Sequence, residues 1–435
     1  MSKTYERSIM FARSGWYSGL VKVFSATNHV LDPSRRLRWE IRGQTCEFPF
    51  FRSKKPLLGK REFTRLTPNF PTTRITPQST AYHFGIINAL IAMRHRFLLA
   101  ASFLYLVGAN LIWIARDTRP PFWDMAEHQS SALRIYDAFA SQGIRGIAEV
   151  PRLTLPYPPF YQSVVAGFYA IFGKSVDAAQ WANLVAMAIL LFATYGLGRT
   201  LLKPVPAAAA AVLVNFYPYL LWLSRETLTD YWLTSMVALA MWSLMLTNDF
   251  SDRKRSIIFG VVCGLGMLTK WTFALFLLLP TLWAARKNIK NAAISAGTAA
   301  VLAGYWYIHA LAALAQLLRI NTAGAVNEGD PDRLSFQAVL FYVRALEGSQ
   351  LFLPLFLAFI AGAILLARNF DRAWMPVVLW IAGGWLGLML FQNKDPRQQR
   401  RSFFNGRKYW SRCSCRSCCF STTWSLSAFR YCRRQ

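Results

Sequence analysis

The sequence has little charge, and acidic residues are especially scarce. Charged residues make up 16% of its 435 residues and hydrophobic residues 54%, and 21 Asp and Glu stand against 49 Lys and Arg. Soluble domains rarely combine so large an apolar share with so few charges, which indicates a multi-pass membrane protein. Residues 1–92 do not read as a signal peptide, since no charged start leads into an apolar core and a small-residue cleavage site.

The net charge of +28 is concentrated at the two ends of the chain. Residues 1–92 carry 15 Lys and Arg against 5 Asp and Glu, and residues 397–435 carry 10 against none. Basic ends around an apolar centre fit a lipid bilayer better than a nucleic acid as the partner.

The N-terminal end also differs from the middle of the chain in composition. Residues 1–92 mix Arg, Pro, Thr and aromatic residues and contain no apolar run long enough to span a membrane. At Met93 a basic flank leads abruptly into an apolar helix, so Met93 can be the true start and the extension before it mis-assigned. A disordered basic cytoplasmic tail is the alternative. The predicted membrane domain is 93–397.

Cysteine is nearly confined to the C-terminal end. Five of the seven cysteines fall in residues 413–435. Their C-x-C-x-x-C-C spacing could bind zinc, but the tail has no His and no second spaced pair of cysteines. An excess of Arg, Ser and Cys without acids is typical of GC-rich DNA read out of frame. We therefore predict that residues 398–435 are an out-of-frame tail and that the protein has no metal site.

Long uncharged runs predict an all-α, polytopic membrane protein, because a spanning helix needs about 20 apolar residues. The runs are Phe97–Ala115, Ala178–Gly198, Pro204–Ser224, Tyr231–Asn248, Asn291–Leu318, Leu351–Ala367 and Ala373–Asn393. A further run, Ser256–Ala285, is interrupted by Lys270 and predicts two short helices that meet at the membrane surface. Seven spans are then expected before the loop 319–350, and two after it.

The basic loops between these runs predict the orientation. Four of them, with their flanks, hold 10 Lys and Arg against 3 Asp and Glu, and the positive-inside rule places them in the cytoplasm. The loops 116–176 and 319–350 then lie outside. This arrangement requires that Pro158–Gly173 does not cross the membrane, and we expect it to be a juxtamembrane helix on the outer face.

A carboxylate follows the first predicted span within an aromatic loop. Asp124 comes directly after Pro120, Pro121, Phe122 and Trp123, at the predicted mouth of the bundle. An acid in this position is a candidate catalytic base. The local alternative is structural, with Asp124 as the N-cap of a helix near 125–142 and Glu127 as its capping partner.

Other ionisable groups on the predicted outer side are costly at membrane depth and need a partner or a role. They are Glu127, Arg225, Glu226, Asp230, Lys270, Lys394 and Arg397. Carboxylates with Lys and Arg suit a phosphate-bearing donor, because cations stabilise the leaving phosphate. Simpler explanations stay open: Arg225 and Asp230 could pair across their loop, Lys270 could extend to the interface, and Tyr157 could belong to an aromatic belt.

The order of these motifs resembles that in membrane glycosyltransferases of the GT-C fold. It runs from Trp123-Asp124 and Tyr157-Pro158-Pro159 through Ser224-Arg225-x4-Asp230 and Gly266-x2-Thr269-Lys270 to Asn393-Lys394-Asp395-Pro396-Arg397. Over roughly 93–397 the chain looks most like the protein O-mannosyltransferase and aminoarabinose transferase branch.

The resemblance implies transfer of a sugar from a polyprenyl-phosphate donor to a hydroxyl of a lipid, glycan or protein acceptor. The reaction would take place on the extracytoplasmic face of the cell (inner) membrane and would need no cofactor. It implies that Asp124 is the essential catalytic carboxylate and that a second set of residues binds the substrate. These are Tyr157, Arg225, Asp230, Lys270, Lys394 and Arg397. Mannosyltransferases of this branch often have a second acid where this chain has Met125, so the sugar stays open. The alternative function is a non-catalytic multi-pass protein, either a lipid-carrier transporter or an inactive truncated relative.

Overall fold

The structure, a computed structural model, describes residues 39–41, 44–46, 77–392 and 394. The chain divides into two compact units, Met1–Arg74 and Ile75–Gln435. In the first unit, β1 (Trp39–Ile41) and β2 (Gln44–Cys46) pair antiparallel, with Trp39 opposite Cys46. The remaining residues of 1–76 and the predicted tail 398–435 lie outside the described part of the chain.

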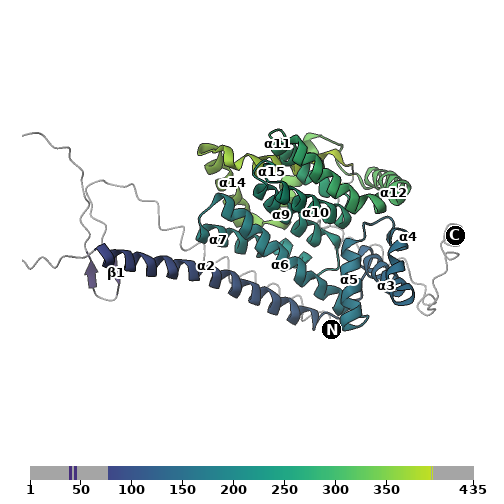
Figure 1. Ribbon diagram of the computed structural model, residues 1–435, viewed down its shortest axis with the longest axis horizontal. Coiled ribbons are helices and arrows are strands. Elements are labelled where there is room, and N and C mark those ends of the chain that lie inside the picture. Colours follow the sequence, from purple (N-terminus) through teal and green to yellow (C-terminus); the bar gives the residue numbers. More distant parts are fainter. Residues whose placement is uncertain (1–38, 42–43, 47–76, 393, 395–435) are drawn as a thin grey trace, which may run out of the picture. The chain divides into compact units, whose positions relative to one another are not determined.

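The second unit is a helical bundle (Figure 1), which confirms the predicted fold class. Its first half contains α2 (Pro77–Ile114), α3 (Asp124–Gln142), η1 (Gly143–Ala148), α4 (Val150–Thr154), α5 (Phe160–Phe172), α6 (Val176–Leu201), α7 (Pro204–Asn215) and α8 (Pro218–Leu223). Its second half contains α9 (Thr229–Leu246), α10 (Arg253–Thr269), α11 (Phe273–Ala285), α12 (Ile289–Glu328), α13 (Phe336–Ala345), η2 (Leu346–Gln350), α14 (Phe352–Arg368), η3 (Arg372–Trp374) and α15 (Met375–Leu390).

Four helices in the described residues are long and apolar enough to cross a membrane. They are His95–Ile114, Val176–Leu201, Ile289–Asn327 and Arg372–Leu390. A fifth span results if Phe336–Gly348 and Phe352–Arg368, bent by 116° at the break between them, cross together. The uncharged runs predicted more spans than this. The numbers differ because several of those runs form shorter or broken helices.

The run Pro204–Ser224 shows why an apolar run does not fix a helix length. Its helix α7 ends at Asn215, and α8 begins at Pro218 after a break of two residues. The residue before a proline disfavours helical backbone angles, and the proline has no N–H to donate to the preceding turn. The predicted boundary at Met93 likewise falls inside a helix, since α2 begins at Pro77.

The predicted break at Lys270 is confirmed. Helix α10 ends at Thr269, Lys270 has extended backbone angles, and α11 begins at Phe273. The ring of Phe273 packs directly on Gly266, where a Cβ would overlap it. Glycine therefore allows the two short helices to fold closely against each other.

Helices α6 and α9 pack at the centre of the bundle, with Trp232 almost fully buried between them and their neighbours. Figure 1 shows α3, α4 and α5 grouped at one end of the bundle. Two hydrogen bonds attach this group to α12: Trp306 Nε1 donates to Thr154 Oγ1 at 3.0 Å, and Tyr305 Oη donates to the carbonyl of Ala148 at 3.1 Å. The first loop is thus a packed helical subassembly.

Helix α5 corresponds to the segment predicted to lie on the outer face. Its 13 residues extend about 20 Å, less than the hydrocarbon thickness of about 30 Å. It packs against α3 and α6, with Tyr161 and Val165 buried in the core. Its location outside the membrane stays a prediction.

Candidate active site

Asp124 is the first residue of α3. The N-cap is Trp123, with a φ of 50° and no capping hydrogen bond from its side chain. Glu127 forms an ion pair with Arg134, with 2.8 Å between Oε1 and Nη2. The alternative in which Asp124 is the N-cap and Glu127 its capping partner is therefore wrong, although the predicted helix itself is confirmed.

The carboxylate of Asp124 is oriented by Tyr157, whose hydroxyl donates to Oδ1 at 3.3 Å. The Tyr157 ring contacts the edge of His128, with 4.8 Å between ring centroids. Gln162 Nε2 lies 3.1 Å from Nδ1 of His128, and both side chains are buried. His128 follows Asp124 by one helical turn, a spacing that could have revealed it, whereas nothing in the sequence marks Gln162.

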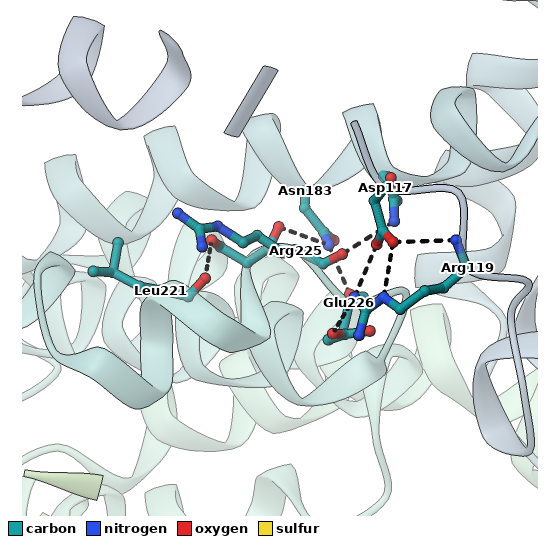
Figure 2. Close-up of polar contacts among 8 residues, drawn as sticks. Asp117, Arg119, Asn183, Leu221, Arg225 and Glu226 are labelled. Carbon is teal, nitrogen blue, oxygen red and sulfur yellow. Dashed lines mark hydrogen bonds and ion pairs between the residues drawn. The ribbon is translucent and has the colours of Figure 1, made fainter. Parts of the chain in front are cut away.

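The loop between α8 and α9 is held by side chains from α6. Asn183 Nδ2 donates to the carbonyl of Glu226 at 2.8 Å (Figure 2) and to that of Ser224 at 3.2 Å. Gln180 Nε2 donates to the carbonyl of Arg225 at 3.2 Å. This backbone therefore sits in a fixed position between α6 and the start of α9.

Arg225 places its guanidinium carbon 4.6 Å from the ring centroid of Trp113. Its Nε is buried without a hydrogen-bond partner in the described part of the chain. Burial lowers the pKa of this guanidinium, because desolvation disfavours its charged form. A cation over an aromatic face with a donor atom to spare can accept an anion.

Asp230 forms an ion pair with Lys270, with 2.8 Å between Oδ1 and Nζ. Asp230 lies in the first turn of α9, and Lys270 lies at the break after α10. The side chains are 28% and 22% exposed. The predicted pairing of Asp230 with Arg225 is thus replaced by a pair that joins two separate helix ends.

Two residues that the sequence did not single out complete the polar surroundings of this loop. Arg119 binds Asp117 through two contacts, Nε to Oδ1 at 2.8 Å and Nη2 to Oδ2 at 2.9 Å. The same Nη2 reaches Glu226 Oε1 at 3.4 Å (Figure 2). Arg119 lowers the pKa of Asp117, whereas burial raises the pKa of Glu226.

The start of α3 adjoins this loop directly. Gln129 Nε2 donates to Thr227 Oγ1 at 3.0 Å. A cavity of about 10 Å³, room for roughly one water, is lined by residues of both segments, including Met125 and Glu226. The elements that carry Asp124 and Arg225 are therefore packed against each other.

Lys394 is completely buried at the end of α15. Its ammonium group donates to the carbonyls of Leu388 and Met389, at 3.3 and 3.1 Å, and to that of Phe391. Here it caps the C-terminus of a helix and does not face an open anion site. Its predicted contact with a phosphate stays a prediction that would require these bonds to open.

The end of α15 nevertheless lies beside the α10–α11 break, because the rings of Trp271 and Phe391 meet at a centroid distance of 5.2 Å. Arg397 lies outside the described residues, so its predicted proximity to Lys270 stays a prediction.

Residues 157–323 match the family model of the dolichyl-phosphate-mannose-protein mannosyltransferases. Comparison with curated proteins and with solved structures finds no significant match. The helical membrane bundle and this match define the class of the protein, a membrane glycosyltransferase. The matched segment confirms the resemblance to the protein O-mannosyltransferase branch, and it includes Tyr157, Arg225, Asp230 and Lys270 but not Asp124.

Proposed function

We propose that the protein transfers a sugar from a polyprenyl-phosphate donor to an acceptor hydroxyl at the extracytoplasmic surface of the cell membrane. The observation that carries this proposal is the way in which three places in the fold are connected: the start of α3, the loop between α8 and α9, and the break after α10. The Asp124 end of α3 packs against the loop with Arg225, and that loop leads into the Asp230–Lys270 pair. The elements that carry the candidate base and the two cations are thus connected to one another.

In the proposed reaction, the acceptor oxygen attacks the anomeric carbon of the lipid-linked sugar. A new carbon–oxygen bond forms, the bond from the anomeric carbon to the phosphate oxygen breaks, and its electron pair leaves with the lipid phosphate. Asp124 takes the proton from the acceptor hydroxyl, while Arg225 and Lys270 stabilise the charge that develops on the phosphate. Asp230 orients Lys270, and Tyr157 orients Asp124.

The placement on the outer side is supported by the distance from the connection between α9 and α10, whose basic residues 253–255 form the first turn of α10. Helix α9, with 18 residues, and helix α10, with 17, each extend about 25 Å from that connection. Asp230 and Lys270 lie at their far ends. If that connection is cytoplasmic, as the positive-inside rule asks, the pair lies at the opposite surface.

The test uses the full chain in proteoliposomes supplied with radiolabelled polyprenyl-phosphate sugars and candidate acceptors. Loss of a general base lowers rates by about 10²–10⁴-fold, so Asp124→Asn is expected to reduce transfer by at least about a hundredfold. Asp137→Asn is the matched control, because Asp137 lies on the same helix but pairs with Lys174 at an exposed site. Near-normal transfer by Asp124→Asn would refute its role, and lipid binding without transfer would favour a lipid-carrier transporter.

A further inference from the structure

We propose that Arg119 and Glu226 are positioning residues for this transfer, holding the segment before Asp124 against the loop that carries Arg225. The proposal rests on the proposed function for its kinetic consequence. The contact itself joins positions 107 residues apart in the sequence. It is visible in Figure 2, where the guanidinium of Arg119 reaches both Asp117 and Glu226.

The first step concerns the burial of the two acids. The side chains of Asp117 and Glu226 expose 8% and 7% of their surface, whereas that of Arg119 exposes 54%. A carboxylate taken out of water needs a compensating partner, and removing that partner is strongly unfavourable. Arg119 is the cation that the structure provides for both acids, so their burial determines where its guanidinium lies.

The second step concerns the Glu226 side of the contact, which is fixed. The backbone carbonyl of Glu226 accepts a hydrogen bond from Asn183 Nδ2 at 2.8 Å. Asn183 is itself oriented by Trp232 Nε1, which donates to its Oδ1 at 3.1 Å. Both Asn183 and Trp232 are buried, so Glu226 offers Arg119 an anchor with little freedom to move.

The third step concerns the link from Arg119 to the base. Arg119 is followed by Pro120 and Pro121, whose φ angles are fixed by their rings. Only Phe122 and the positive-φ residue Trp123 then precede Asp124. A displacement of Arg119 is therefore passed along a short, stiff connection to the first turn of α3.

Other ion pairs of the first loop lack these properties. Lys174 and Asp137 pair at 2.7 Å, but their side chains are 47% and 62% exposed. An exposed pair contributes little free energy. Lys174 thus provides a matched control, since its pair also ties α3 to a neighbouring segment.

The kinetic test compares Arg119→Ala, Glu226→Gln, the double variant and Lys174→Ala in the same transfer assay. Because misplacing a reacting group by about an ångström can cost about a hundredfold in rate, each single variant is expected to lower kcat by about tenfold or more. The donor KM should change by less than about twofold. The double variant should be no slower than Arg119→Ala alone, because the contact between Arg119 and Glu226 is already lost in that single variant. Arg119→Lys should recover part of the rate.

Hydrogen exchange provides a readout that does not depend on sugar transfer. Amides of residues 115–127 should exchange faster in Arg119→Ala and Glu226→Gln than in the wild type. In Lys174→Ala their exchange rates should be unchanged. If the wild type transfers no sugar, the proposed function fails while the exchange result still decides the contact. Unaltered exchange, additive losses of kcat in the double variant, or a rise confined to KM would each overturn the positioning role.

Discussion

Lys270 and Asp230 form an ion pair between the end of α10 and the start of α9, with 2.8 Å between Nζ and Oδ1. Their side chains are partly shielded, at 22% and 28% exposure. The carboxylate holds the ammonium group of Lys270 at the break between two short helices. A phosphate that approaches this break would meet a cation whose position is already set.

The first prediction concerns this cation. Lys270→Ala should raise the KM for the lipid-linked donor by about tenfold, while the constant for the acceptor changes little, because the lost interaction is made with the phosphate. Lys270→Arg should keep part of the affinity. Lys287→Ala is the control, since Lys287 pairs with Asp249 in a more exposed position. An unchanged donor KM in Lys270→Ala would contradict the assignment.

The second prediction concerns Tyr157, whose hydroxyl lies 3.3 Å from Oδ1 of Asp124. A hydrogen bond to a charged group contributes about 1.5–3 kcal/mol at best, and this one is long. Tyr157→Phe should therefore lower kcat by about threefold to tenfold and leave the donor KM in place. Tyr169→Phe in the same helix group is the comparison that should leave kcat unaffected. A loss as large as that of Asp124→Asn would mean that Tyr157 itself takes part in the chemistry.

The local structure of this site could be predicted from the sequence better than its pairings. A single cation in an apolar run predicted the break at Lys270, and an acid before an amphipathic segment predicted α3. The partner of Asp230 was not predictable, because Arg225 is five residues away along the chain and Lys270 is 40. Local spacing favours near neighbours, while the packing of α9 on α10 decides the contact.

The same limit explains what was missed around Arg119 and Lys394. The Arg119–Glu226 contact depends on how the first loop folds back onto the bundle, which no local pattern encodes. Lys394 occurs in a motif that resembles a phosphate-binding one, but its ammonium group reaches the free carbonyls at the end of α15. Helix ends leave such carbonyls without partners, and a nearby lysine can satisfy them.

The third prediction concerns pH and follows from the burial of Glu226, which raises its pKa above the usual range of a glutamate. The groups that face its carboxylate are Arg119, which opposes this rise, and Asp117, which adds to it. Ionised Glu226 is the costly form in the folded state. The stability it contributes is therefore present below its unfolded pKa and is lost as the pH rises through the folded pKa.

Acidification should consequently weaken the ion pair between Glu226 and Arg119, because it protonates Glu226. That protonation should not itself destabilise the folded protein. As the pH falls toward the raised pKa of Glu226, kcat should begin to decline. In Glu226→Gln the maximal rate is lower, and the acidic limb of the pH–rate profile should shift to lower pH. Asp117, whose pKa is lowered by Arg119, stays ionised over this range. Identical acidic limbs in the two proteins would contradict the role of Glu226.

The fourth prediction concerns the membrane side of the site. Helix α5, with 13 residues, extends about 20 Å, too short to cross about 30 Å of hydrocarbon without distortion. If α5 does not cross, Lys174 at its end lies outside and Lys254 at the start of α10 lies in the cytoplasm. The test places single cysteines at these two positions in a chain whose other cysteines have been replaced.

A membrane-impermeant thiol reagent should label Lys174→Cys in intact cells and Lys254→Cys only after permeabilisation. Both lysines are exposed in the structure, so access differs between the two positions because of the membrane and not because of burial. Labelling of position 254 from outside would mean that α5 spans or that the basic loops face outward. Helices α9 and α10 place Asp230 and Lys270 about one helix length from position 254. That result would therefore move the pair to the cytoplasmic surface. A donor presented outside could not reach it there.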